Sequence, residues 1–208
     1  MAVNPNVLKR FVIYMAILTF VMFTVWGFVR SFMDRPPGDY ETEVCDIRLK
    51  DKLYDKAIQA ANTALEKTPN HRGAIMCKAL VFISQEMYLE ANAALDYLIS
   101  FLEKTVEGDD LTGIGTLAAA YANRGIIKDR NKNYQGALQD YLKALGIDDE
   151  AVAGPGLGTI ILNYKFKSSS VKERALYLNE QLQLPEDERV LSIKELDEGQ
   201  VMHKPGKL

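Results

Sequence analysis

Three segments of the chain share one helical pattern, and this recurrence constrains the fold more than any other feature. Each segment opens with a tyrosine that is followed three residues later by an alanine: residues 54–67, 88–104 and 134–146. Ala57 and Ala91 lie 34 residues apart, and Ala137 follows Ala91 after 46 residues, twelve more than the first interval. Apolar residues recur here with the 3.6-residue period of amphipathic helices, whereas strand-like alternation is scarce. The sequence therefore predicts an all-α fold built from repeated helix pairs.

A 34-residue period of paired helices is typical of the tetratricopeptide repeat, and residues 38–150 resemble that family. The resemblance gives three units, at residues 38–71, 72–105 and 118–150. An insertion at 103–117 is expected to lengthen the second helix of unit two and to add a loop. The residues that match the family pattern are Cys45, Tyr54, Ala57 and Ala64 in unit one, Ala79, Tyr88 and Ala91 in unit two, and Gly125, Tyr134, Ala137, Tyr141 and Ala144 in unit three. Arg48 and Leu98 depart from the pattern, since the family usually has an aromatic and a small residue there.

This spacing has a physical reason, which is close packing of helices. Two antiparallel helices approach closely only where the side chains at their crossing are small, and we expect Gly125 to face Ala137 for this purpose. Tyr134 and Tyr141 then fill the gaps to the next pair. No unit buries its apolar face alone, so three to four such units are expected to stack into an α-solenoid.

The region after residue 150 repeats less clearly. Residues 151–191 are predicted to form divergent capping helices, and helix breakers open this region. Ser170 is a candidate N-cap, and Glu173 three residues later completes the sequence pattern of a capping box. Residues 192–208 have weak periodicity, which predicts an extended or disordered tail.

The first thirty residues form a different region. Phe11–Val29 is a run of nineteen residues without a charge, and as a helix it would span about 28 Å, close to the roughly 30 Å hydrocarbon core of a bilayer. A cleaved signal peptide would need a shorter apolar core and a small-residue cleavage site, which the following residues do not offer. We therefore predict an N-terminal tail at 1–10, a single transmembrane helix at 11–30 that contacts the lipid bilayer, and a linker at 31–39 that contains a proline pair.

The distribution of charge predicts the orientation of the chain in the membrane and bears on whether nucleic acid is a partner. Lys9, Arg10 and the α-amine precede the apolar run, while Arg30 and Arg35 follow it with an acid between them. The positive-inside bias favours a cytoplasmic N-terminus and a periplasmic body in the inner membrane of a bacterium, with a cytoplasmic body as the alternative. After residue 30 the chain carries 22 basic and 28 acidic residues, because three of its 25 basic residues and none of its 28 acids precede residue 31. An acidic body argues against nucleic acid as a partner.

The sequence offers no constellation for catalysis. Two cysteines, Cys45 and Cys77, are too few for a disulfide scaffold and fit no metal motif, so two buried thiols are expected, with a single disulfide as the open alternative. His71 and His203 lie far apart in the sequence, and the glycine-rich residues 154–159 lack the lysine of a phosphate-binding loop. We expect a protein that is not an enzyme, with no cofactor, no metal and no small-molecule substrate.

The tetratricopeptide resemblance implies a groove lined by the first helices of the units. Its positions in this chain are Asp39, Thr42, Glu43 and Asp46 in unit one, Met76, Leu80 and Ile83 in unit two, and Ala122, Asn123, Ile126 and Asp129 in unit three. An acidic mouth and an apolar centre suit a helix or extended segment of another protein. The alternative is that the chain's own cap or tail covers the apolar positions.

As a whole, the chain resembles small membrane-anchored tetratricopeptide proteins of bacteria. The resemblance implies a scaffold or assembly factor of a membrane protein complex. The alternative is an accessory structural subunit, present in fixed ratio, whose transmembrane helix is built into a larger complex.

Overall fold

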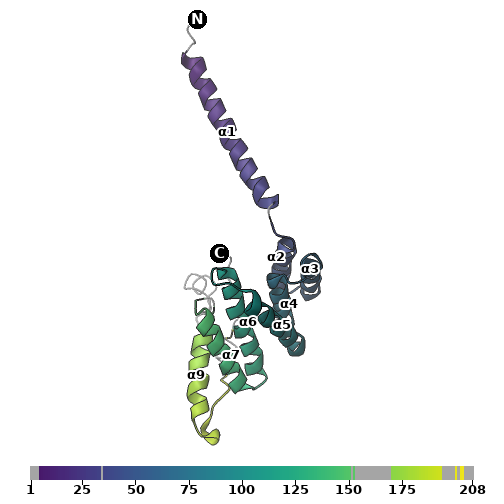
Figure 1. The fold of residues 1–208 in the computed structure, drawn as a ribbon, viewed down its shortest axis with the longest axis vertical. Coiled ribbons are helices and arrows are strands. Elements are labelled where there is room, and N and C mark those ends of the chain that lie inside the picture. Colours follow the sequence, from purple (N-terminus) through teal and green to yellow (C-terminus); the bar gives the residue numbers. More distant parts are fainter. Residues whose placement is uncertain are drawn as a thin grey trace. The chain divides into compact units, whose positions relative to one another are not determined.

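The computed structural model describes residues 5–33, 35–150, 152, 170–193, 200 and 202–203. The described part of the chain is helical, which confirms the predicted all-α class for those residues (Figure 1). The helices are α1 (Pro5–Met33), α2 (Asp39–Lys50), α3 (Tyr54–Lys67), α4 (Arg72–Ser84), α5 (Tyr88–Thr105), α6 (Leu111–Arg130), α7 (Tyr134–Ile147) and α9 (Val171–Gln183), with a short 3-10 helix at Glu186–Glu188. The chain divides into two compact units, Met1–Pro37 and Gly38–Leu208. The second unit is called the helical body below.

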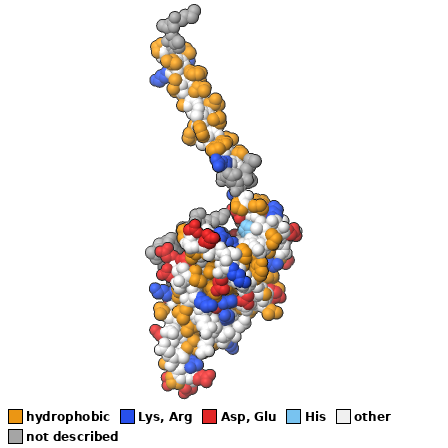
Figure 2. Space-filling model, in the orientation of Figure 1, with side chains coloured by type: hydrophobic (Ala, Val, Ile, Leu, Met, Phe, Trp, Pro, Cys, Tyr) orange, Lys and Arg blue, Asp and Glu red, His pale blue; other side chains and the backbone are white. Residues whose placement is uncertain are grey.

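The first unit contains one helix, α1. Its residues Pro5–Arg30 are long and apolar enough to cross a membrane, and Figure 2 shows hydrophobic side chains along its length. Thr19 and Thr24 are polar positions within it, and each hydroxyl donates a hydrogen bond to a carbonyl of the preceding turn. These two hydroxyls are therefore satisfied inside the helix, as an apolar environment requires.

The helical body is built from consecutive helix pairs. α2 packs on α3, α4 on α5 and α6 on α7, and α7 also contacts α9. The first helices of successive pairs contact one another as well, α2 with α4 and α4 with α6. The second helix of each pair also contacts the first helix of the next, α3 with α4 and α5 with α6. Each pair is therefore buried against its neighbours in chain order.

The three turns within these pairs have the same backbone geometry. Each contains one residue in the left-handed region, Lys52 at φ 58°, Glu86 at φ 59° and Lys132 at φ 62°. In each turn the next residue donates its backbone N–H to a carbonyl five residues earlier, at 2.8–2.9 Å. A left-handed conformation is costly for a side chain with a Cβ, so its recurrence at three equivalent points is a property of the fold. It could not be predicted from the sequence, because no glycine or asparagine occupies the left-handed position.

The twelve additional residues between the second and third pairs are distributed over three elements. α5 has 18 residues where α3 has 14, and α6 has 20 where α4 has 13, so only one extra residue lies in the connecting loop. The third unit thus begins at Leu111 and not near residue 118. The physical reason is the N-cap: Asp110 accepts a hydrogen bond from the N–H of Gly113 at 2.8 Å, and this starts α6 seven residues early.

Small residues form much of the core of the helical body. The pattern residues Ala57, Ala64, Ala79, Ala91, Ala137, Tyr141 and Ala144 are all fully buried. Tyr54, Tyr88 and Tyr134 are half-buried. The expectation that Gly125 faces Ala137 needs correction, because the atoms nearest to a Cβ built on Gly125 belong to the ring of Tyr141, at 2.6 and 2.7 Å. Gly125 therefore makes room for an aromatic ring one turn beyond Ala137.

The last described helix, α9, begins as the sequence predicts. Ser170 accepts a hydrogen bond from the N–H of Glu173, and the Glu173 carboxylate accepts one from the N–H of Ser170. The capping box is therefore confirmed. Residues 151 and 153–169 of the predicted capping region lie outside the described residues.

Candidate functional site

The residues predicted to line a groove lie in two separate places. Met76, Leu80, Ile83, Ala122, Asn123, Ile126 and Asp129 belong to α4 and α6 and are all buried. Thr42, at the N-terminal end of α2, is also buried, whereas Asp39, Glu43 and Asp46 on the same helix are half-buried. The two groups have different neighbours.

The chain's own C-terminal segment lies against the α6 residues. We call the residues that bond to this segment, or that line the space beside it, the tail site: Ser84 of α4, Asn123, Ile126 and Asp129 of α6, Tyr141 of α7 and Arg174 of α9. The segment that occupies it is described at Gln200, Met202 and His203. Of the two alternatives for this face, partner or own tail, the structure has the tail.

Asn123 holds the backbone of the tail. Its side-chain carbonyl accepts a hydrogen bond from the N–H of His203 at 2.8 Å, and its amide donates to the carbonyl of His203 at 2.7 Å. The amide also lies 3.6 Å from the Met76 sulfur. Asn123 is fully buried, so both of its polar atoms need partners, and one residue of the tail supplies them.

A buried ion pair forms the second half of the tail site. Arg174 donates two hydrogen bonds to the Asp129 carboxylate, at 2.7 and 2.8 Å, and both side chains are almost fully buried. The Tyr141 hydroxyl donates to the same carboxylate at 3.1 Å. Burial, followed by the Asp129 charge, raises the pKa of Tyr141 well above its usual value. The phenol therefore stays protonated and serves as a donor.

Tail residue Gln200 completes this network. Its amide nitrogen lies 2.7 Å from Asp129 Oδ2 and 3.2 Å from the Tyr141 hydroxyl. Arg174 also donates to the carbonyl of Leu191 at 3.0 Å. The network thus connects α6, α7 and α9 with two points of the chain after α9.

The His203 side chain is enclosed in the tail site. It is 6% exposed, and the space left around it beside Ile126 and Tyr141 amounts to about 10 Å³. Burial lowers the pKa of His203 to about 4. The imidazole is therefore neutral when the tail is bound at neutral pH.

A cavity of about 220 Å³ adjoins Gln200. It is lined by Asp129, Arg130, Lys132, Tyr134, Ser192 and Gln200. Sites for small-molecule ligands usually measure roughly 300–1,000 Å³ and are mainly apolar. This cavity is smaller and polar residues line it, which suits water.

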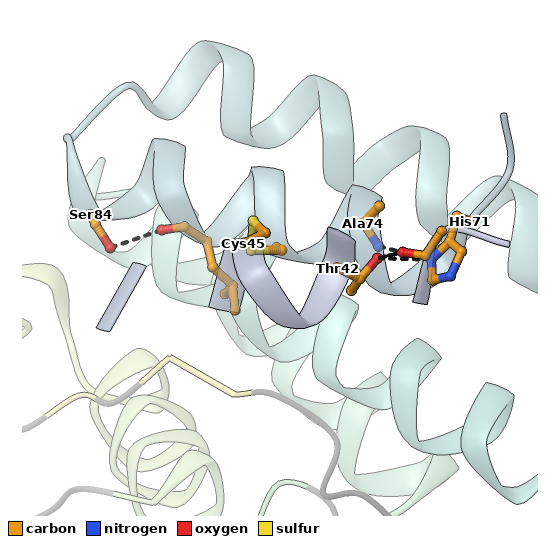
Figure 3. Close-up of a disulfide and its surroundings, with 8 residues drawn as sticks. Thr42, Cys45, His71, Ala74 and Ser84 are labelled. Carbon is orange, nitrogen blue, oxygen red and sulfur yellow. Dashed lines mark hydrogen bonds between the residues drawn. A yellow bond between two sulfur atoms is a disulfide. The ribbon is translucent and has the colours of Figure 1, made fainter. Parts of the chain in front are cut away.

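The α2 positions lie beside a disulfide bond (Figure 3). Cys45 of α2 and Cys77 of α4 are joined, with their Cα atoms 6.4 Å apart. The expectation of two buried thiols was therefore wrong, and the alternative of a single disulfide is correct. Both residues are fully buried and lie in the contact between α2 and α4. Sequence spacing alone could not bring them together, because the contact depends on how successive pairs stack.

Near the disulfide, Asp39, His71 and Thr42 are arranged like an acid–histidine–hydroxyl triad. His71 Nε2 lies 2.9 Å from the Asp39 carboxylate, and Nδ1 lies 3.4 Å from the Thr42 hydroxyl. However, Nδ1 accepts a hydrogen bond from the N–H of Ala74 and so caps α4, while the Thr42 hydroxyl donates to the carbonyl of Gly38. In this arrangement His71 takes no proton from Thr42, so the hydroxyl is not activated as a nucleophile. The cluster serves to join the start of α2 to the start of α4.

A further charged cluster lies on α5, α6 and α7, which the sequence reading missed. Arg124 makes a two-pronged hydrogen bond to Asp140, at 2.8 and 2.7 Å, and a third bond to Asp96. Its hydrogen bond to Asp140 raises the pKa of Arg124 above its usual value. Arg124 also lies over the ring of Tyr121, whose pKa is raised to about 12 by burial and by a hydrogen bond to Glu103. These contacts fasten three helices together.

Among the described residues, no group of three histidine, cysteine or acidic side chains could hold a metal ion. Comparison with models of known protein families and with curated proteins gave no match. The case for a function therefore depends on the geometry of the tail site and of the disulfide.

Proposed function

We propose that this chain is a membrane-anchored protein of the tetratricopeptide type that binds other proteins, as a scaffold or assembly factor of a membrane protein complex. The proposal depends on the two hydrogen bonds between the Asn123 side chain and the backbone of His203, a residue 80 positions later in the chain. A buried side chain that pairs with both polar groups of one residue recognises a peptide backbone, and backbone recognition is how proteins bind extended segments. The proposed role is one of binding and not of catalysis.

The helix contacts support the repeat assignment. The pairs α2–α3, α4–α5 and α6–α7 share one turn geometry, and their first helices contact one another in succession. Stacking of similar pairs with like helices side by side is the architecture of a helical solenoid. The three units and the capping region of the sequence interpretation are part of this proposal.

The disulfide supports a body on the far side of the inner membrane of a bacterium. Disulfides persist in oxidising compartments such as the periplasm and are rare in the cytosol. The charges that flank the apolar run favour the same orientation. Protease added to sealed inside-out vesicles, whose outer face is the cytoplasmic one, should leave the helical body intact, and thiol-reactive mass labels should find no free cysteine until a reductant is added. A body that is digested in those vesicles, with both thiols free, would place it in the cytoplasm.

The contacts of α1 favour a membrane anchor over the alternative of an accessory subunit whose transmembrane helix is built into a larger complex. Both of its threonine hydroxyls bond to its own backbone. An anchor also raises the local concentration of the body near membrane partners, so a modest affinity suffices.

Extraction of the full chain in mild detergent, followed by native mass measurement, tests the proposal. We expect another protein to co-purify with the chain in less than equal amount. The control is a tagged protein with a single membrane span and no helical body, and we expect the other protein not to co-purify with it. A constant ratio would favour the accessory subunit. A strictly monomeric species under all extraction conditions would contradict the binding role.

A further inference from the structure

We propose that the tail site is a peptide-binding site for an extended segment with the side-chain chemistry of Gln200–His203, and that a partner segment enters it by displacing the chain's own tail. This inference rests on the proposed function and names the site and the ligand class. Three contacts define what the site accepts: one to the backbone and two to side chains.

The backbone contact selects an extended strand. The N–H and the carbonyl of His203 both face the Asn123 amide, at 2.8 and 2.7 Å. In extended chain the two polar groups of one residue point in the same direction, as in a hydrogen-bonded pair of antiparallel strands. Asn123 therefore replaces a strand partner, and a helical ligand, whose N–H and carbonyl are already bonded, would not fit.

The first side-chain contact selects a hydrogen-bond donor. Gln200 places its amide nitrogen 2.7 Å from Asp129 Oδ2, and this carboxylate is already paired with Arg174. A carboxylate accepts hydrogen bonds and donates none. A ligand residue at this position therefore needs an amide or hydroxyl donor, and an acidic residue is repelled.

The second side-chain contact selects an uncharged ring preceded by a flexible apolar residue. His203 nearly fills its enclosure, with about 10 Å³ left, roughly the space of one water. Met202 precedes it, packs partly buried against the main core cluster, and places its sulfur 3.9 Å from the Ser84 hydroxyl. The ligand class is therefore a segment with a donor residue and, two positions later, an unbranched apolar residue followed by a neutral ring.

The tail is suited to exchange because its described contacts to the site are non-covalent. Each pair from α2 to α7 is buried against its neighbours, so the tail can open locally without unfolding them. A segment of the same chain competes at an effective concentration on the order of millimolar. An isolated peptide should therefore bind the intact chain weakly, and more tightly once the tail's own contacts are removed.

A labelled peptide with the sequence of residues 200–208 tests the proposal by fluorescence anisotropy on the full chain in detergent. Substituting Gln200→Ala and His203→Ala in the chain's own tail should tighten binding of the unmodified peptide by about tenfold or more, since the tail loses the hydrogen bonds of Gln200 and the buried ring of His203. Adding Asn123→Ala to that chain should remove the gain in affinity for the peptide. Asn131→Ala, an exposed asparagine at the end of the same helix, is the matched control and should leave it unchanged.

Two further arms keep the outcome decisive. A chain ending at Gly199 should bind the peptide as well as the tail-substituted chain does, and a peptide with Gln200→Ala and His203→Ala should bind either chain at least about tenfold more weakly. Equal binding of both peptides, or no binding to the tail-substituted chain while its helical signal is intact, would overturn the peptide site. Because only purified components are used, this failure is separate from that of the proposed function, which is judged by co-purification.

Discussion

The two ends of the helical body are held by different chemistry. At the N-terminal end, a covalent bond between Cys45 and Cys77 joins α2 to α4, and His71 caps α4 beside it. At the C-terminal end, hydrogen bonds between Asn123 and His203 and an ion pair between Asp129 and Arg174 hold α9 and the tail. A covalent bond keeps one arrangement, whereas hydrogen bonds can be exchanged for equivalent ones. The N-terminal end is therefore held in one arrangement, whereas the C-terminal end is the one at which we propose that another segment binds.

The buried ion pair gives the largest expected effect at the C-terminal end. Arg174→Ala leaves the Asp129 carboxylate buried without its cation, and loss of one partner of a buried pair costs about 3–5 kcal/mol of unfolding free energy. Arg72→Ala removes an arginine from a half-exposed pair with Asp110 and should cost about 0–1 kcal/mol. Urea unfolding followed by circular dichroism measures both. Equal losses would mean that Asp129 and Arg174 are not buried together.

The disulfide gives the next largest effect, at the opposite end. Cys45 and Cys77 are 32 residues apart, and removing the bond with the pair Cys45→Ala and Cys77→Ala should cost about 2–4 kcal/mol. A reductant should lower the melting temperature of the natural chain and leave that of the substituted chain unchanged. Peptide binding at the tail site should survive reduction. If reduction abolishes it, the two ends are coupled and the comparison fails.

Substitution of two glycines distinguishes the effect of close packing on stability from that of helix propensity. Gly125→Ala drives a methyl group to within 2.6–2.7 Å of the Tyr141 ring, which is itself held by Asp129, so we expect a loss of about 1–3 kcal/mol. Gly146 in α7 has nothing within 4 Å of an added Cβ, so Gly146→Ala should stabilise the chain by about 0.5–1 kcal/mol. Opposite shifts in melting temperature are the expected result. Shifts of the same sign would show that the α6–α7 contact is looser than described.

Binding of the tail is also expected to depend on pH. A free histidine has its usual pKa near 6.5, whereas burial lowers the pKa of His203 to about 4. Binding is therefore at full strength above pH 6.5 and weakens as the pH falls toward 4. At pH 5.5 the peptide of residues 200–208 should bind the chain that ends at Gly199, which has no competing tail, about tenfold more weakly than at neutral pH. A peptide with His203→Gln serves as the control, and an equally steep pH profile for it would assign the effect to other groups.

The helices and their local signals could be predicted from the sequence, whereas most of the contacts that join the helices could not. The Tyr-to-Ala spacing and the Ser170 capping box are local, so they can be read from the chain. The disulfide and the contact of Asn123 with His203 join residues 32 and 80 positions apart. Such contacts depend on how the pairs stack, which composition and periodicity do not encode. The early start of α6 at Asp110 was the exception, since an aspartate three residues before Gly113 is a signal that could have been used.

Hydrogen exchange at the His203 amide is the most direct test of the central claim that the tail is held in its site by Asn123. In the full chain, this amide should exchange at least about tenfold more slowly than in the free peptide of residues 200–208. Asn123→Ala should remove the protection, while amides in the middle of α6 remain protected. Exchange of His203 at the free-peptide rate in the folded natural chain would contradict the account.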